Sequence, residues 1–485
     1  MDLSAGLTAE TPPHAAAPGY GARDAAPLDA GAAPVTALGG SGAADPIRQQ
    51  IDRVIAGIDG LLSEQVNRIV AHPRFRALEA SWRSLARLVE TARHSTWIRI
   101  RVLDLRWAEL CRDLERAIEF DRSQLFRKIY EEEFGTAGGE PFGLLVGDYT
   151  VSHRRRPGRS GDDIAALQGM ARIAAAAFAP FVVDAAPELL GLDGFAELST
   201  PVNLAALLRD AEYDRWRSFQ ENDESRFLGI VLPHVLASAP YRDDGTRRDG
   251  FRFCDDRTEA DELAWGGGAY AFAAVAMRAF IESGWFAAIR GGVVGSEEGG
   301  IVPDLDIPWF DTDQPEIATI FPGEVQIEDT QEAELGELGF IPVVRANGTS
   351  LAVFCGNASV QRPRAYDQAL ATVNARLSAM LQYILCISRF AHYLKCLGRD
   401  AIGSVATAEA IQRRLQQWIT QYCNTNETAP LATLARRPLR EARVEIREMA
   451  DRPGAYYCVA HLQPHFQLDR VETSFRLVTD LTAPG

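Results

Sequence analysis

The chain has 485 residues and almost no lysine: of its 50 basic residues, only Lys128 and Lys395 are lysine. A Walker A loop needs a lysine directly after a glycine to reach the phosphates of a nucleotide, and neither lysine follows a glycine. The sequence therefore excludes a P-loop ATPase. It also has no GxGxxG, GxSxG or HExxH pattern, so the usual signatures of dinucleotide binding, serine hydrolases and zinc proteases are missing.

Cysteine is sparse, and long apolar runs are absent. The seven cysteines are scattered without CxxC spacing, which predicts neither a disulfide framework nor a zinc site. No run of about 18 apolar residues occurs, and the first residues do not combine a basic segment with an apolar one. We therefore expect a cytoplasmic protein that does not insert into a membrane.

Basic residues are also fewer than acidic residues, and the formal net charge is -16 at pH 7. Binding to a phosphate backbone needs clustered cations, and an anionic membrane surface repels a chain of this charge. We therefore expect no nucleic-acid partner.

One acidic stretch and two glycine clusters are candidate ion-binding sites. Seven carboxylates fall within twenty residues: Glu297, Glu298, Asp304, Asp306, Asp311, Asp313 and Glu316. Carboxylates suit hard cations, but EF-hand spacing is absent, so a solvated loop is favoured over a cation site. The clusters Gly266–Gly268 and Gly291–Gly292 could cradle an anion, although turns or close backbone approach explain them more simply. His392 has no second ligand beside it and is interpreted as structural. We expect no catalytic residue, cofactor or metal.

The sequence divides into three regions. Residues 1–45 are rich in Ala, Pro and Gly and poor in large apolar residues, which predicts disorder. In residues 46–365 a helix begins at Asp45-Pro46, and His72-Pro73 separates it from a second helix with its own apolar stripe, which predicts a helical pair. Strand-like and helix-like segments then alternate, so the predicted fold class is α/β with mixed α+β layers. Those segments are a strand over 97–105, a helix over 107–130, a strand over 142–146, a helix over 163–183, a strand over 227–232 and a helix over 269–283.

Residues 366–485 form the C-terminal region. We predict a long helix over Gln368–Leu397, with Asp367 as its N-cap and Gly398 as its end, and a second helix over Thr407–Gln421. Two strands follow around a turn at 451–454, and a third extended stretch covers Ser474–Leu481.

In the first of these strands, apolar and charged residues alternate, so its two faces can be assigned. Even positions such as Val444 and Ile446 are apolar, while Arg443 and Glu445 belong to a ladder of alternating charge on the other face. The second strand, Tyr456–Leu462, is apolar on both faces, which predicts a central strand. The predicted interface residues are Val444, Ile446, Arg443, Glu445, Tyr457 and Val459.

A sheet of two or three strands is marginal on its own, so this sheet is expected to be covered or extended. Further strands could come from the same chain or, by strand exchange, from another subunit. Both alternatives remain open from these residues.

The chain resembles a known family along its length from about Ile47. The segments that carry the resemblance occur in the family's order: FRALEASWRSLARLVE (from Phe75), PFGLLVGDY (from Pro141), AEYDRWRSFQENDESRFLGIVLPHVLASAPY (from Ala211), WGGGAYAFA (from Trp265), ELGFIPV (from Glu337), SRFAHYLK (from Ser388), RPLREARVE (from Arg437) and LQPHFQL (from Leu462). They are similar to the large subunit of the type VI secretion contractile sheath (TssC/VipB-like).

The resemblance implies a structural protein rather than an enzyme. Such a large subunit co-assembles with a small sheath subunit and further copies of itself into a helical tube, which surrounds an inner tube protein, stands on a baseplate and contracts to propel the inner tube. The resemblance also implies exchange of terminal strands between neighbours and recycling by an AAA+ disassembly ATPase. Family members carry a helical segment near the N-terminus for that ATPase, and residues 1–45 show no counterpart. The alternatives are an accessory sheath-like binding protein that does not polymerise and a soluble metal-dependent enzyme.

Overall fold

The computed structural model divides the chain into two units, one ending at Ile58 and the other beginning at Asp59. The described part of the first unit is the beginning of helix α1 (Ala44–Val70), which starts beside Asp45-Pro46 as predicted. Residues 1–43 lie outside the described residues, so the predicted disorder there stays a prediction. The structure describes residues 44–136, 138–156, 161–241, 251, 253, 255–258, 262–292, 298–308, 320–402, 407–426, 429–448, 456–465 and 475–481.

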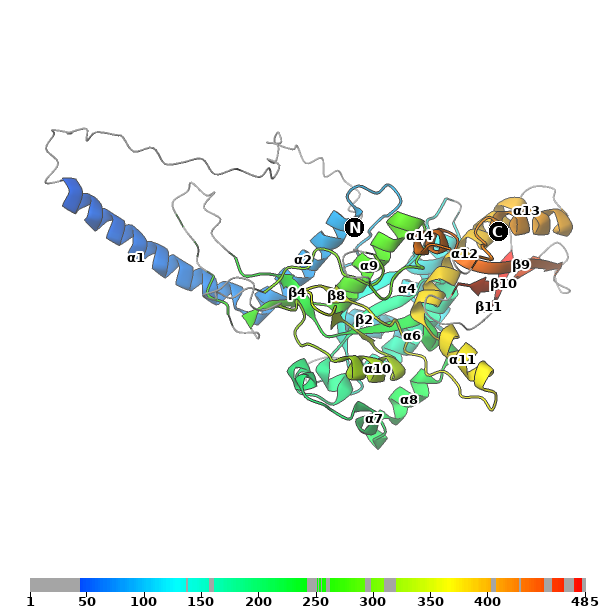
Figure 1. Ribbon diagram of the computed structural model, residues 1–485, viewed down its shortest axis with the longest axis horizontal. Helices are drawn as coiled ribbons and strands as arrows, with labels where there is room; N and C mark the ends of the chain where they lie inside the picture. The colour runs from blue at the N-terminus through cyan, green and yellow to red at the C-terminus, as the bar shows by residue number, and fades with distance from the viewer. Residues whose placement is uncertain are drawn as a thin grey trace. The chain divides into compact units, whose positions relative to one another are not determined.

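A parallel sheet lies in the core of the second unit (Figure 1). Its strands are β1 (Leu145–Val151), β2 (Phe181–Ala185), β3 (Leu228–Leu232) and β6 (Ile341–Pro342), in the order β1-β2-β3-β6. All three neighbouring pairs are parallel. β2 and β3 are buried at every position, as expected of strands that are covered on both faces.

Helices α6 (Asp163–Ala177) and α9 (Gly268–Ser283) cover opposite faces of this sheet (Figure 1). Val183 of β2 belongs to the same apolar cluster as Ile173 of α6. Its neighbour Val182 belongs instead to the cluster of Phe272 of α9, because successive side chains of a strand point to opposite faces. The predicted mixture of helix and sheet layers is therefore confirmed.

The C-terminal region has a core of its own. It contains α12 (Leu381–Ile402), α13 (Ala408–Thr420) and an antiparallel sheet of β9 (Leu439–Glu448), β10 (Tyr456–Pro464) and β11 (Phe475–Leu481). The strand order is β11-β10-β9, so β10 is the central strand, as its apolar character on both faces predicts. The turn predicted at 451–454 lies outside the described residues.

The structure contains further helices, short turns and two small sheets. The remaining helices of six residues or more are α2 (Pro73–Ala92), α3 (Trp107–Arg116), α8 (Asp214–Gln220), α10 (Asp329–Glu337), α11 (Ala369–Ser378) and α14 (Leu431–Arg436). The short turns are η1 (Phe120–Arg122), α4 (Gln124–Phe126), η2 (Arg127–Glu131), α5 (Glu132–Phe134), η3 (Pro187–Leu190), η4 (Phe195–Ser199), α7 (Leu204–Leu207), η5 (Ala211–Tyr213) and η6 (Asp223–Phe227). Two small antiparallel sheets pair β4 (Val235–Ser238) with β5 (Ala264–Gly266) and β7 (Val344–Arg345) with β8 (Ala352–Val353). Among the described residues, no helix has both the length and the apolar character needed to cross a bilayer.

The single helix predicted over Gln368–Leu397 is in fact two helices, α11 and α12. They are separated where a neighbouring extended segment takes the backbone hydrogen bonds. The N–H of Ser359 donates to the carbonyl of Ala379 at 3.1 Å, and the N–H of Leu381 donates to the carbonyl of Asn357 at 2.8 Å. The apolar spacing continues across the break, so periodicity alone could not reveal it.

Other predicted boundaries also differ. Residues 97–105 form no strand, although they were predicted to be one. The helix predicted over 163–183 ends at Ala177, because Phe178 takes a left-handed conformation (φ 50°) and β2 begins at Phe181. The N-cap of α11 is Gln368 rather than Asp367, and α12 continues through Gly398 to Ile402.

Candidate assembly surfaces

The even face of β9 packs inside the chain. Val444 is 1% exposed and lies in one apolar cluster with Leu415 of α13 and with Cys458 and Ala460 of β10, while Ile446 packs against its border. The prediction that the even positions of this strand form its buried face is therefore correct. Val444 and Ile446 hold the terminal sheet on its own helices, so their predicted role at an interface can only be indirect.

The odd face of β9 carries charge. Glu445 lies between two arginines, 3.2 Å from Arg443 and 3.0 Å from Arg447. The hydrogen bond from Arg447, with the charges of both arginines, lowers the pKa of the Glu445 carboxyl. Both arginines are largely solvated and Glu445 is half-buried, so the pairs contribute little to stability and the arginines remain available for another molecule.

Two further predicted interface residues lie on this odd face, since Tyr457 is opposite Arg447 and Val459 is opposite Glu445. Val459 is nonetheless only 1% exposed, so of the two only Tyr457, which is half-buried, offers surface. The structure thus brings Arg443, Glu445 and Tyr457 to one face. Their contact with another subunit stays a prediction.

Helix α2 exposes a stripe of large apolar side chains. Leu78, Trp82 and Val89 recur on one face and are 55%, 64% and 54% exposed, while Leu88 is buried. Further exposed apolar residues of the second unit are Leu61, Leu62, Ile69, Trp97, Val102 and Leu103. The first unit exposes Ile47, Ile51, Val54, Ile55 and Ile58. The stripe of α2 is therefore exposed in the second unit, and exposed apolar area of this kind marks an interaction surface.

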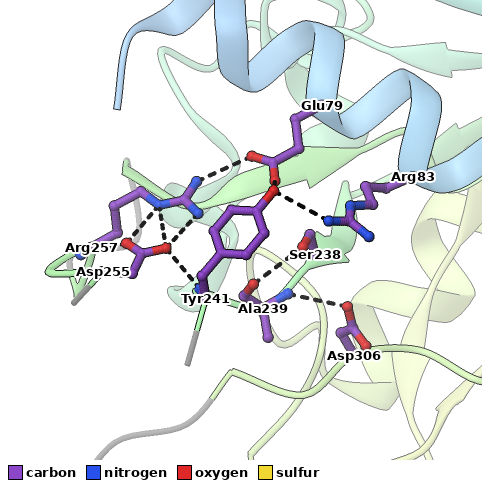
Figure 2. Close-up of polar contacts among 8 residues, drawn as sticks. All are labelled: Glu79, Arg83, Ser238, Ala239, Tyr241, Asp255, Arg257 and Asp306. Carbon is purple, nitrogen blue, oxygen red and sulfur yellow. Dashed lines mark hydrogen bonds and ion pairs between the residues drawn. The ribbon is translucent and has the colours of Figure 1, made fainter. Parts of the chain in front are cut away.

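The buried face of α2 anchors a distant loop through a polar network (Figure 2). The hydroxyl of Tyr241 donates to Glu79 at 2.6 Å and accepts from Arg83 at 3.2 Å. Arg257 lies 3.3 Å from the second oxygen of Glu79, and it also pairs with Asp255 at 2.7 Å. Glu79 and Tyr241 are 162 positions apart, so no local pattern could have indicated this network.

Replacing Tyr241 with phenylalanine is expected to cost about 1–2 kcal/mol, because Glu79 is 7% exposed and would keep only its longer contact with Arg257. Thermal unfolding of the variant should show a lower midpoint. Tyr366→Phe is the matched control, since Tyr366 is 53% exposed. Equal midpoints for the two variants would show that the network does not stabilise the loop.

The first glycine cluster accommodates a carboxylate that belongs to the chain itself. Asp184, at the end of β2, accepts from the N–H of Ala269 at 2.7 Å at the start of α9. A Cβ on Gly267 would lie 2.0 Å from Asp184 Oδ2. Burial raises the pKa of Asp184 to about 7. In the second cluster, a Cβ on Gly292 would lie 2.7 Å from Ile301, so close approach explains both clusters, as expected.

Part of the acidic stretch faces arginines of α2. Asp306 accepts from the N–H of Ala239 at 3.1 Å (Figure 2). Burial lowers the pKa of Arg87, while the charges of Asp306 and Asp304 oppose that shift. Among the described residues, no group of carboxylates, histidines and cysteines is placed to hold a metal ion. Four of the seven predicted carboxylates lie outside the described residues: Glu297, Asp311, Asp313 and Glu316.

His392 is structural, as interpreted from the sequence. It is 2% exposed on α12, its Nε2 lies 2.8 Å from the carbonyl of Ala177, and its Nδ1 lies 3.1 Å from Arg389. Burial, followed by the charge of Arg389, lowers the pKa of the ring to about 3. The neutral imidazole thus joins α12 to the end of α6.

Two solved structures show a low similarity to the chain. One is the sheath tail protein from Desulfitobacterium hafniense, with 10% identity and a TM-score of 0.30, where the match covers 67% of this chain and 62% of that one. The other is the anti-feeding prophage baseplate, with 13% identity, a TM-score of 0.30 and coverage of 60% and 58%. The chain thus spans less than two thirds of the length of either protein, and neither bears on its function.

Family models and a curated relative match much more closely. The model described as EvpB/VC_A0108, tail sheath N-terminal domain, matches residues 52–361, and the model of the tail sheath gpW/gp25-like domain matches residues 370–481. The type VI secretion system sheath protein TssC1 of Pseudomonas aeruginosa is 39% identical over 438 residues, which are 89% of this chain and 86% of the relative. The chain belongs to this family, the large subunits of the type VI secretion contractile sheath, which are structural proteins that assemble with other sheath subunits.

Proposed function

We propose that this chain co-assembles with a small sheath subunit into a helical tube around an inner tube protein, and that contraction of the tube propels the inner tube. The match of both sheath domains over nearly the whole chain carries this proposal. It includes a baseplate on which the tube stands, a AAA+ disassembly ATPase that recycles it, and a cytoplasmic location. The chain then acts as a structural part and not as an enzyme.

The mechanism needs no active site. Copies that contact one another head to tail through two different surfaces form a helical filament when their rotation does not close. If each subunit moves between an extended and a compact arrangement, small free-energy differences add along the tube. The extended tube then persists because each interface breaks only after its neighbour has moved.

We also propose the division of the chain into residues 1–45, 46–365 and 366–485. The two family models support the second boundary, because one ends at 361 and the next begins at 370. The separate apolar core around α12, α13 and the terminal sheet supports it as well.

The exposed stripe of α2 is the surface that we assign to the small sheath subunit. An apolar stripe along one helix fits the apolar face of another helix. Trp82 lies in the middle of the stripe and is its most exposed member, so it is the anchor that an incoming helix would cover. Arg443, Glu445 and Tyr457 on the odd face of the terminal sheet are proposed contacts with neighbouring copies.

Co-expression with the small subunit tests the proposal. We expect the two chains to co-purify and negative-stain microscopy to show tubes. Trp82→Glu should reduce co-purification about tenfold or more, because it places a charge in an apolar contact. Ala77→Glu is the control, since Ala77 is exposed on the same helix but about 140° around its axis.

A monodisperse chain that does not bind the small subunit would contradict the proposal. Co-purification without tubes would instead indicate an accessory sheath-like protein. Equal losses of co-purification with Trp82→Glu and Ala77→Glu would show that the α2 stripe is not the contact with the small subunit. Tube formation by the unmodified chains would still test the proposed function.

A further inference from the structure

The residues at the break between α11 and α12 do not themselves require a break. Residues 369–397 include no glycine and no proline, although breaks in helices usually occur at such residues. Most residues at the break are alanine, leucine, arginine or methionine, which are good helix formers. The apolar stripe also continues through it, because Leu377, Met380 and Ile384 follow helical spacing. The local sequence therefore favours one helix where the structure has two.

Two backbone groups at the break each have two competing partners. The N–H of Leu381 donates to the carbonyl of Asn357 at 2.8 Å, whereas in a continuous helix it would donate to the carbonyl four residues earlier. The carbonyl of Ala379 accepts from the N–H of Ser359 at 3.1 Å and also from the hydroxyl of Ser359. In a continuous helix it would accept from the N–H four residues later. The extended segment 357–359 thus takes the place of helical partners.

The departure from helical geometry is short. Ala379 keeps a helical conformation (φ -91°, ψ -2°), and its N–H donates to the carbonyl of Ala375 at 3.2 Å. The regular pattern then resumes, since the N–H of Ile384 donates to the carbonyl of Met380 at 3.3 Å. Met380 alone separates Ala379 from the first residue of α12. A change in a few dihedral angles would therefore join the two helices.

The two helices differ in how firmly they are packed. Leu381, at the start of α12, is fully buried in the same apolar cluster as Val231 of β3. Of the α11 side chains that the structure describes, those of residues 371–378, only Leu377 is buried. α12 is thus fixed on the central sheet, and α11 is the helix that can move with the smaller loss of contacts.

The break also lies where one matched domain meets the next. The model of the N-terminal sheath domain ends at residue 361, and the model of the gpW/gp25-like domain begins at residue 370. Asn357 and Ser359 belong to the first domain, whereas α11 and α12 belong to the second. The competing hydrogen bonds therefore connect the two domains.

We propose that α11 and α12 form a two-state joint: when segment 357–359 releases Ala379 and Leu381, α11 moves into line with α12 and the two become one continuous helix. Each released group regains a helical partner, so few hydrogen bonds are lost in the exchange. The joint gives the two domains a second relative position. This inference goes beyond the proposed function, because it concerns a conformational change within one chain.

Hydrogen exchange of the Ser359 N–H tests the joint, because this group is bonded only while the helix is broken. Ala379→Gly should slow the exchange about fivefold, since Ala379 becomes an interior helical residue in the joined state, where glycine is unfavourable. Ordinary local unfolding predicts the opposite sign, because glycine makes an unfolded segment more favourable. Ala375→Gly is the matched control, since Ala375 is helical in both states and should leave the exchange unchanged.

A disulfide provides the second arm. Ala358 and Met380 are paired in an antiparallel bridge. The two backbone bonds flank this pair, so it is of the non-hydrogen-bonded type, with Cα atoms about 4.5 Å apart. That separation suits a disulfide. Oxidation of the Ala358→Cys/Met380→Cys variant should hold the helix broken and slow exchange of the Ser359 N–H at least tenfold relative to the reduced form.

Both arms use the full chain in complex with the small subunit, or the full chain alone if no complex forms. Failure of the proposed function thus leaves the test intact. Equal or faster exchange with Ala379→Gly would overturn the joined helix. Equal exchange in the oxidised and reduced forms of the double cysteine variant would show that segment 357–359 does not release the break.

Discussion

Val444→Asp is expected to unfold the terminal sheet and abolish tube formation. Val444 is 1% exposed and packs against α13 and β10, so the new carboxylate has no route to water. Burying a charge without a partner costs several kcal/mol, at least about 4 kcal/mol at a site of this kind. That loss is comparable with the whole stability of a small sheet on two helices, so local unfolding should follow.

The measurement is the number of tubes in negative stain after co-expression with the small subunit. Arg443→Ala is the matched control on the adjacent residue, because it removes a solvated charge from the odd face and leaves the core intact. We expect it to make tubes that are more sensitive to salt. Normal tubes from Val444→Asp would show that the even face is not essential for assembly.

Gly267→Ala is expected to destabilise the central sheet by about 3 kcal/mol. The added Cβ would lie 2.0 Å from Oδ2 of Asp184 and 2.8 Å from its Cγ, so the carboxylate must move. Asp184 is buried beneath the beginning of α9 and would lose its bond to the N–H of Ala269. A buried carboxylate that loses this bond has no water to replace it.

Thermal unfolding of the complex with the small subunit measures this effect. Gly336→Ala is the control, since a Cβ there meets nothing within 4 Å and the residue lies in α10. Alanine is a better helix former than glycine, so the unfolding midpoint of this variant should equal that of the unmodified chain or lie slightly above it. If both variants unfold at the same temperature, close packing of Asp184 is not what requires glycine at position 267.

Local patterns predicted the terminal strands well. The alternation of Val444 and Ile446 with charged residues identified the buried face of β9 without any tertiary information. The apolar run over Tyr456–Leu462 likewise identified the central strand. Each signal depends on the two-residue period of a strand, which is a property of the backbone alone.

Local patterns failed where distant segments compete for the same groups. The apolar stripe over Gln368–Leu397 is continuous, yet the bond from Ser359 to Ala379 divides it into two helices. The stripe of α2 was correctly predicted to be apolar along one face, yet Leu78, Trp82 and Val89 remain exposed. Periodicity shows that a face is apolar and does not show what covers it.

By itself the sequence determined the chain's membership of the sheath family, its mixed helix and sheet class, and the two faces of its terminal strands, because these follow from segment identity and from local periods. Only the tertiary structure decided that the carboxyl group beside the Gly266–Gly268 cluster is that of Asp184, that Tyr241 links a loop to Glu79, and that Gln412 and Gln416 of α13 accept hydrogen bonds from backbone N–H groups of β9. Each of these is a contact between groups far apart in the chain or on different elements, and its geometry exists only once the elements have packed.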